Sequence, residues 1–231
     1  MRIILASNSP RRRELLSGLG LEYEVRTLQG IDESYPQGLA MEEIPQYISR
    51  KKAAAYSLKP DELLITADTI VWLDGEVLGK PADEEDARRM LRKLSARTHT
   101  VVTGVTLTYW NEEARVKDEA FPAGQETGTR DIGATASPSS LAPHPSSCPQ
   151  PFPSICQVTF PSVSQVTFAQ LTDSEIDRYV AQYRPLDKAG AYGIQEWIGY
   201  IGIASIEGSY FNVMGLPVQR LYTELKKRNF I

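Results

Sequence analysis

The chain has 231 residues, 42% of them hydrophobic, and its 25 Lys and Arg residues against 29 Asp and Glu residues give a formal net charge of −4 at pH 7. This length is ample for a hydrophobic core in one large domain or two small ones. A mildly acidic chain with no apolar run of the roughly 18–20 residues that span a bilayer is expected to have neither nucleic acid nor a membrane as partner.

The cysteines and the N-terminal sequence indicate the cellular compartment in which the protein is expected. Cys148 and Cys156 stand in a Pro- and Ser-rich stretch with neither a partner pair nor the spacing of a metal site, which fits a reducing environment. The N-terminal apolar run passes directly into Ser7-Asn8-Ser9, without the apolar core of a signal peptide. We therefore expect a cytoplasmic protein.

The first elements predicted are a strand, a turn and a helix. Residues 3–6 form an apolar run too short to assign by periodicity alone. The helix start that follows favours a strand for this run, because Ser9 suits an N-cap and Pro10 suits the first helical position. Gly20 is expected to end the helix.

A second helix and a hairpin are expected next. Helical spacing of apolar residues predicts a helix over about residues 42–57. Residues 63–67 predict a buried strand, and residues 70–78 predict a hairpin because Asp74-Gly75 suits a two-residue turn. Asp68-Thr69 would then lie between two apolar runs, with Asp68 at the end of a strand.

The rest of the chain continues to alternate helices with strands. An amphipathic pattern with acidic residues in its first turn predicts a helix over 83–94, and a run rich in Val and Thr predicts a long strand over 98–109. Further patterns predict a capped helix over about 172–183, a strand over 198–206 and a helix over 217–227. Interleaved strands and helices with one hairpin indicate an α/β fold with a mixed sheet.

One region departs from this pattern. Residues 122–156 contain seven of the fifteen prolines, six serines and only three charged residues, a low-complexity composition for which we expect no fixed structure. Residues 153–160 are then repeated almost letter for letter as 161–168, so only one copy can occupy a given position in the sheet. A duplication and insertion tolerated at a surface hairpin is the simpler explanation, since loop closure costs about 0.6 kcal/mol per doubling of length. A regulatory or partner-binding insert is the alternative.

The first candidate site is the turn Ser7-Asn8-Ser9-Pro10-Arg11-Arg12-Arg13. A helix N-terminus offers unpaired N–H groups and the positive end of the helix dipole, and added hydroxyls and arginines make a phosphate cradle. The alternative is an ordinary cap followed by solvated arginines. The Gly-Lys-Ser/Thr of a Walker loop is absent from this turn.

Two carboxylates form the second candidate. Asp68, at an expected strand end, is placed as a metal ligand or a general base, and Glu33 in the turn-rich segment could share a cation with it. Each could equally be a structural residue.

Lysines and an amide form the third candidate. Lys52 comes late in a helix, where compensation of the helix dipole would explain it, whereas Lys80 in Gly79-Lys80-Pro81 has no helix to stabilise. Lys188 begins a glycine-spaced segment that ends at Gln195 and would let a backbone approach a ligand closely. A plain surface loop is the alternative for both residues.

The sequence offers few residues for a catalytic or metal site built on histidine or cysteine. His99 and His144 are far apart in the sequence, and neither cysteine has an activating neighbour. The cations and carboxylates that are left are the groups used in metal-dependent phosphate chemistry.

Four of these segments, together with a fifth, stand in the same order as the motifs of a known family. They are Ala6-Ser7-Asn8-Ser9-Pro10-Arg11-Arg12, Thr66-Ala67-Asp68-Thr69, Gly79-Lys80-Pro81, Asp187-Lys188-Ala189-Gly190-Ala191-Tyr192-Gly193-Ile194-Gln195, and Gly208-Ser209-Tyr210 through Gly215-Leu216-Pro217. On these motifs the chain resembles the Maf family of nucleoside triphosphate pyrophosphatases everywhere except about residues 119–164. Five separated motifs in register are far more specific than any one of them.

The resemblance implies one domain over residues 1–231, interrupted by a disordered insert at about 119–164. Its fold would be an elongated mixed sheet flanked by helices, with two lobes and a central cleft, as in the inosine triphosphate pyrophosphatases. The implied activity is hydrolysis of a nucleoside triphosphate to the monophosphate and pyrophosphate with a divalent cation, Mg²⁺ or Mn²⁺. The family also suggests a homodimer.

Three positions match the branch of the family that acts on dTTP and UTP. They are Arg11 after the Ser-Pro, Thr69 after the motif aspartate, and Gln195 at the end of the Tyr-Gly motif. The 7-methyl-GTP branch looks different, with glutamate at the Gln195 position. A neutral amide can both donate to and accept from a pyrimidine edge, whereas a carboxylate suits a cationic methylated guanine.

The same resemblance assigns roles by position. Asp68 would be the proton acceptor and, with Glu33, would hold the metal, while Lys52 and Lys80 would offset charge on the leaving pyrophosphate. Substrate binding would fall to the remaining candidates, which are Ser7, Arg11, Arg12, Thr69, Lys188 and Gln195.

The insert is the departure from the family pattern. A strand over 116–121 should pair with one of the two repeated copies, and we favour 165–168 because it leads directly into the next helix. A nucleotide-responsive regulator of cell division and an insertion variant with damaged catalysis are the alternatives to a dTTP/UTP pyrophosphatase.

Overall fold

A computed structural model describes residues 1–110 and 155–231, and these form an α/β fold around a mixed sheet of seven strands. The strand order is β2-β1-β3-β5-β6-β7, with β4 paired to β3. The strands are β1 (Arg2–Leu5), β2 (Tyr23–Val25), β3 (Glu62–Leu73), β4 (Glu76–Leu78), β5 (Thr98–Trp110), β6 (Ile155–Phe168) and β7 (Ile203–Glu207). The α-helices are α1 (Pro10–Ser17), α2 (Glu43–Ala54), α3 (Glu84–Leu94), α4 (Asp173–Tyr183), α5 (Trp197–Gly202), α6 (Tyr210–Met214) and α7 (Val218–Lys227).

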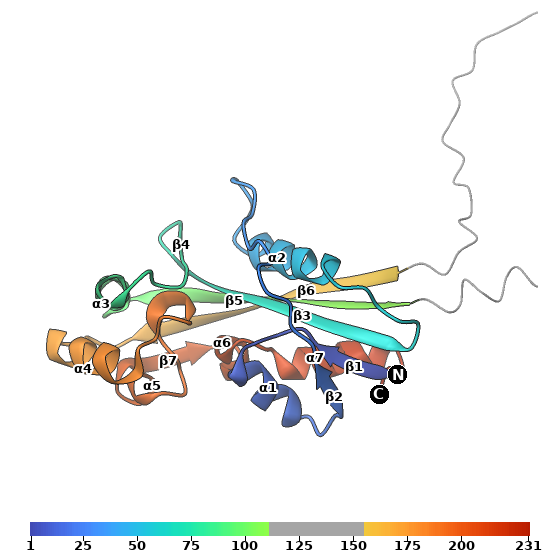
Figure 1. Ribbon diagram of the computed structural model, residues 1–231. Helices are drawn as coiled ribbons and strands as arrows, with labels where there is room; N and C mark the ends of the chain where they lie inside the picture. Colours follow the sequence, from blue (N-terminus) through green and yellow to red (C-terminus); the bar gives the residue numbers. More distant parts are fainter. Residues whose placement is uncertain (111–154) are drawn as a thin grey trace, which may run out of the picture.

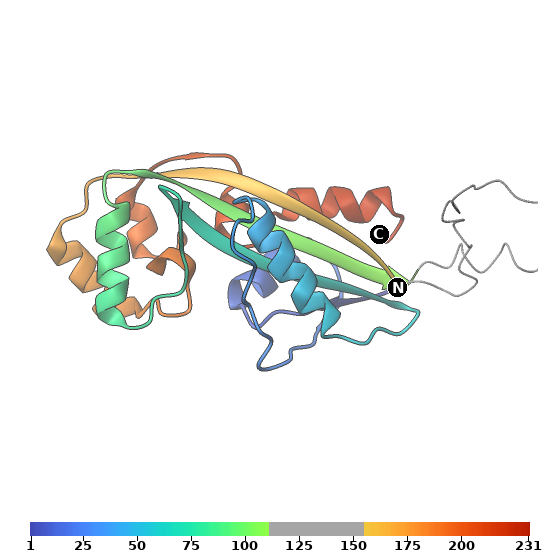
Figure 2. The same cartoon turned by 90° about the horizontal axis from the view of Figure 1, so that it is seen from above.

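Three long antiparallel strands, β3, β5 and β6, form the spine of the molecule and give it its elongated shape (Figures 1 and 2). At one end, β1 and β2 add parallel strands beside α1, and at the other end α3, α4 and α5 gather (Figure 2). The expected α/β architecture with two lobes is therefore confirmed. None of the helices in the described ranges is both long enough and apolar enough to cross a bilayer.

The spine has a core on each face. Helix α2 packs on one face, where Ile44 and Ile48 meet Ile70 of β3 and Val102 of β5. Helices α1 and α7 cover the opposite face (Figure 1), which carries the larger apolar cluster. Because successive side chains of a strand point to opposite faces, neighbouring residues of β3 are divided between these two layers.

The helices begin and end close to the predicted positions. Asp83 caps α3 by accepting a hydrogen bond from the Asp86 N–H at 2.8 Å, and Thr172 forms a capping box with Glu175 at the start of α4. Ser9 stands at the N-cap position of α1, but its side chain makes no capping hydrogen bond. The Ser9 N–H instead donates to Ser7 Oγ at 3.2 Å, and this hydrogen bond closes the turn that precedes α1.

Two secondary-structure predictions were wrong. Strand β3 runs unbroken through Asp68 and Thr69, which pair with Gly104 and Thr103 of β5, so Asp68 lies inside a strand and not at its end. Residues 197–202 form helix α5, and only Ile203–Glu207 is strand. An apolar run this short does not distinguish the two-residue period of a strand from the 3.6-residue period of a helix. In the structure Ile198 and Gly202, four residues apart, are both buried, which is the helical spacing.

The two repeated copies lie end to end in one strand. Strand β6 begins at Ile155 and pairs with β5 throughout, from Trp110↔Ile155 to Thr98↔Thr167. Both copies therefore pair, where a single one was expected to, and residues 155–164 belong to the sheet instead of the insert. The repeat period of eight is even, so both copies present the same alternation and Phe160 and Phe168 enter the same core. The expected partner strand over 116–121 lies outside the described residues.

Candidate active site

A cavity of about 630 Å³ opens between the two lobes and gathers all ten residues that the sequence singled out. The phosphate-cradle turn, the turn-rich segment around Glu33 and the end of α2 contribute from one side, and the Gly79-Lys80 turn and the 187–195 segment contribute from the other. The ten are Ser7, Arg11, Arg12, Glu33, Lys52, Asp68, Thr69, Lys80, Lys188 and Gln195.

Strand β3 directs two neighbouring side chains into different parts of this cavity. Asp68 shares the face of β3 that packs on α2, and there it accepts a hydrogen bond from Lys52 Nζ at 2.7 Å. Thr69 points to the opposite face, where its Oγ1 lies 3.0 Å from a terminal nitrogen of Arg12, on α1. The alternation of a strand thus supplies a carboxylate to one wall and a hydroxyl to the other.

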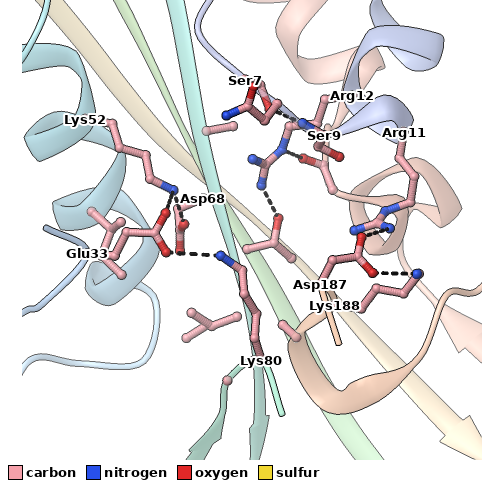
Figure 3. Close-up of a pocket in the computed structure, with 18 of the residues that line it drawn as sticks. Ser7, Ser9, Arg11, Arg12, Glu33, Lys52, Asp68, Lys80, Asp187 and Lys188 are labelled. Atoms are coloured by element: carbon pink, nitrogen blue, oxygen red, sulfur yellow. Dashed lines mark hydrogen bonds and ion pairs between the residues drawn. The ribbon is translucent and has the colours of Figure 1, made fainter. Parts of the chain in front are cut away.

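Two lysines and two carboxylates form a cluster on the α2 side (Figure 3). Lys52 Nζ lies 2.7 Å from Asp68 Oδ1 and 2.9 Å from Glu33 Oε1, and Lys80 Nζ lies 3.3 Å from Glu33 Oε2. Burial alone would raise the pKa of the Glu33 carboxyl, but the two ammonium groups outweigh it and hold that pKa below its usual value. The Glu33 carboxylate is therefore ionised at neutral pH and available to a cation or a water molecule.

The cradle turn places its two arginines differently. Arg12 turns inward, with Nε donating to the main-chain oxygen of Gly215 at 2.8 Å. Arg11 reaches across to the other lobe, where a terminal nitrogen donates to Asp187 Oδ2 at 3.3 Å (Figure 3). An ion pair therefore links the N-terminal cradle to the 187–195 segment.

The 187–195 segment is held by charge pairs. Lys188 is buried, with 7% of its surface exposed, and its Nζ lies 2.7 Å from Asp187 Oδ1 and 3.2 Å from Glu196 Oε1. The Tyr179 hydroxyl of α4 donates to Glu196 and accepts from the Gly193 N–H at 3.0 Å. The alternative of a solvated loop lysine is thereby excluded for Lys188. Gln195 also lines the cavity, and its Oε1 is buried without a hydrogen-bond partner in the described ranges.

Sequence reasoning missed several of the supporting residues. Asp187 and Glu196 could have been predicted as site residues, because they are adjacent in sequence to Lys188 and Gln195. Tyr179 and Thr103, whose Oγ1 lies 2.9 Å from Thr69 Oγ1, could not be singled out, since a tyrosine in an amphipathic helix and a threonine in a β-strand are typical of a core.

The cavity suits an anionic ligand. Its lining carries five cationic side chains against three carboxylates, the former being Arg11, Arg12, Lys52, Lys80 and Lys188 and the latter Glu33, Asp68 and Asp187. The described residues hold no group of three or more His, Cys, Asp or Glu side chains placed for a metal ion. His99 makes its hydrogen bond to the Tyr192 hydroxyl, at 2.8 Å, and is not part of the lining.

The fold and the cavity define an elongated α/β protein whose interlobe cleft combines cationic walls with a pair of carboxylates. The chain belongs to the Maf-like protein family, whose model matches residues 2–126 and 153–228. Residues 127–152 are left unmatched, within the region where the sequence departs from the family pattern.

Curated relatives align over nearly the whole chain. A dTTP/UTP pyrophosphatase of Phocaeicola vulgatus is 56% identical over 228 residues, covering 98% of this chain and 95% of that protein. Proteins of the same name from Bacteroides thetaiotaomicron and Flavobacterium psychrophilum are 51% and 40% identical, and each alignment covers at least 97% of this chain and 95% of the relative. A dITP/XTP pyrophosphatase structure from Mycobacterium abscessus has a TM-score of 0.37 and 12% identity, covering 100% of this chain and 97% of that one, a likeness too weak to bear on the fold.

Proposed function

We propose that this protein hydrolyses dTTP and UTP to the nucleoside monophosphate and pyrophosphate. The observation that carries the proposal is the cluster in which Lys52 Nζ contacts both Asp68 and Glu33 at the wall of a cation-lined cavity. The relatives described above, which carry the name dTTP/UTP pyrophosphatase, support this choice over other nucleotides.

In this reaction a water oxygen bonds to the α-phosphorus while the bond from that phosphorus to the bridging oxygen breaks. Asp68 accepts the proton that the water loses, and the pyrophosphate leaves with the electron pair of the broken bond. Lys52 and Lys80 offset the charge that develops on this leaving group, and such groups are typically worth about 3 kcal/mol each in the transition state. Ser7 and Arg12 hold the triphosphate in line with the water.

Base preference is assigned to residues outside the cluster of Lys52, Asp68 and Glu33. Arg11, Thr69 and Gln195 lie on the lining with functional groups that can meet a pyrimidine edge, and Lys188 adds a buried positive charge. Gln195 Oε1, which has no hydrogen-bond partner in the part of the chain that the structure describes, favours a ligand that brings a hydrogen-bond donor to it.

Asp68 and Glu33 also suit a divalent cation. Mg²⁺ and Mn²⁺ prefer oxygen ligands, and Mg²⁺ is commonly held by one or two carboxylates together with phosphate oxygens and water, which matches a pair of carboxylates with no third protein ligand in the described ranges. When bound, the ion would polarise phosphate oxygens and neutralise their charge. A cytoplasmic homodimer completes the proposal.

The test is pyrophosphate release by the purified protein with Mg²⁺ or Mn²⁺ from dTTP, UTP, CTP, GTP, 7-methyl-GTP and ITP. We expect turnover centred on dTTP and UTP, and loss of at least about a hundredfold in kcat for Asp68→Asn. Asp61→Asn is the matched control, because Asp61 is exposed and pairs with Arg2 away from the cavity. Nucleotide binding without turnover by the folded protein would contradict the proposal and favour a nucleotide-responsive regulator.

A further inference from the structure

The Gly208–Pro217 motif, which has no role in the proposed reaction, forms α6 and the turns at its two ends. Asn212 of α6 is fully buried, with an exposed fraction of 0%. Its Nδ2 donates to the main-chain oxygen of Val101 at 3.2 Å and to Ser164 Oγ at 3.0 Å, which ties α6 to β5 and β6. Asn212 does not line the cavity.

Two main-chain oxygens, one within α6 and one at its C-terminal end, accept hydrogen bonds from side chains at and behind the cavity wall. The oxygen of Gly215, at the C-terminal end of α6, accepts from Arg12 Nε at 2.8 Å, and the oxygen of Asn212 accepts from Thr103 Oγ1 at 3.1 Å. Gly215 has φ +114°, a conformation that favours glycine. The end of α6 is thereby shaped to reach Arg12.

Thr103 connects these contacts to the cavity wall. It is fully buried on β5, and its Oγ1 lies 2.9 Å from Thr69 Oγ1 on β3. A hydroxyl has one hydrogen, and that of Thr103 is used on the oxygen of Asn212, which can only accept. Thr103 therefore accepts from Thr69, and Thr69 in turn accepts from Arg12.

The result is a hydrogen-bond chain with a single direction, which runs from the Arg12 guanidinium through the Thr69 and Thr103 hydroxyls to the Asn212 main-chain oxygen. Hydrogen bonds in such a chain polarise one another and strengthen together. Arg12 commits two of its five N–H hydrogens to Gly215 and Thr69, which leaves three for a ligand and fixes the plane of the guanidinium.

We propose that Thr103 is a positioning residue for Arg12, acting through Thr69 and anchored by Asn212. The inference rests on the proposed function, in which Arg12 holds the triphosphate. Thr103 lies outside the cavity lining and touches no substrate, so its effect on the reaction passes through the orientation of the guanidinium. A second consequence is that Thr69, whose hydrogen is committed to Thr103, offers the cavity an acceptor only.

The test compares two nearly isosteric variants of Thr103 with a matched control. Thr103→Val removes the hydroxyl, Thr103→Ser keeps it, and Thr108→Val removes a hydroxyl from an equally buried threonine of β5 that contacts Gln157 instead of the cavity. We expect kcat/KM for dTTP to fall about tenfold in Thr103→Val and less than twofold in the other two. Weaker inhibition by inorganic pyrophosphate should accompany the loss.

A double-mutant cycle separates positioning from a merely structural effect. If Thr103 acts through Arg12, the loss caused by Thr103→Val should shrink to less than twofold when it is made in Arg12→Ala protein. Equal losses in the two backgrounds, or wild-type activity of Thr103→Val, would overturn the proposal. If Thr103→Val does not fold, Thr103→Cys is held to the same criteria. Failure of the proposed function is distinguishable, because wild-type protein would then show no turnover of dTTP at all.

Discussion

Lys52 Nζ lies 2.7 Å from Asp68 Oδ1, and both side chains are largely removed from solvent, with 14% and 13% of their surfaces exposed. The ammonium group comes from the last turn of α2 and the carboxylate from the middle of β3. The geometry of the proposed reacting groups therefore depends on how closely α2 packs on the sheet.

Replacing Lys52 with methionine tests the role of this ammonium group. Lys52→Met keeps the length of the side chain, removes the charge near Asp68 and Glu33, and should lower kcat/KM for dTTP about a hundredfold. Lys51→Met is the control, since Lys51 is the neighbouring residue, pairs with Asp32 at 2.6 Å and does not line the cavity. Equal losses in the two variants, measured as pyrophosphate release, would argue against a specific role for Lys52.

Gly104 sets the distance between α2 and the sheet. A Cβ atom at this position would lie 2.4 Å from the main-chain atoms of Pro45 and Gln46, so the helix must move if a side chain is added. Gly104→Ala is expected to cost about 1–3 kcal/mol in the free energy of unfolding and to lower kcat by displacing Lys52 from Asp68. Gly18→Ala, where the nearest atom would lie at 3.4 Å, should leave both quantities nearly unchanged in chemical denaturation and turnover assays.

The sequence predicted the residues of the site better than their geometry. Capping residues and apolar periods located α1, α3 and α4, and motif spacing selected residues that do share one cavity. Asp68, however, was expected at a strand end, because two polar residues between apolar runs resemble a break. Inside a strand they are tolerated, since each faces a polar partner, Lys52 in one layer and Arg12 in the other.

The supporting contacts could not be predicted for a different reason. The chain that links Arg12 to Asn212 joins residues about 200 positions apart and depends on the registers of β3 and β5, which local patterns do not specify. The repeat illustrates the same limit. Its second copy was favoured for leading into the next helix, and it does, but only the pairing with β5 reveals that both copies form one strand.

His99 should make the stability of the protein depend on pH. Burial lowers the pKa of this imidazole from its usual 6.5 to about 4, so the unfolded chain binds the proton more readily between these values. The contribution of neutral His99 is therefore fully present above pH 6.5 and is lost as the pH falls toward 4. We expect the free energy of unfolding to drop by about 1 kcal/mol between pH 7 and 5.5, above the range where most carboxyl groups titrate.

The variant His99→Gln isolates this effect. It should lower stability at pH 7 through the lost contacts with Phe168 and Tyr192, yet make the free energy of unfolding nearly independent of pH between 7 and 5.5. Denaturant titrations at four or five pH values would measure both slopes. Parallel curves for the two proteins would show that the histidine is not the titrating group.

Gln195 should discriminate among nucleotides. Because Gln195→Glu places a charge where a neutral amide oxygen is buried with no partner among the described residues, we expect kcat/KM to fall about tenfold or more for dTTP and UTP, and less for purine nucleotides. Gln29→Glu introduces the same charge at an exposed position of the same cavity and should affect all nucleotides alike. An equal loss on every nucleotide in Gln195→Glu would count against Gln195 as a base-reading residue.

Removing residues 127–152, the segment that the family model leaves unmatched, tests whether the insert affects catalysis. The β5–β6 ladder ends at Trp110↔Ile155, and among the described residues the cavity lining includes none from 102–110 or 155–186, so the deletion removes none of the ladder and lining residues that the structure describes. It shortens the connection between the two strands by more than half, and loop closure changes by only about 0.6 kcal/mol per doubling of length. We therefore expect kcat/KM within twofold of the intact protein and a melting temperature that is equal or slightly higher.

A variant with a Gly/Ser segment of the original length in place of residues 127–152 separates the effect of composition from that of length. A severalfold rise in kcat/KM on deletion, matched by the Gly/Ser replacement, would instead show that the native segment lowers the activity of the enzyme.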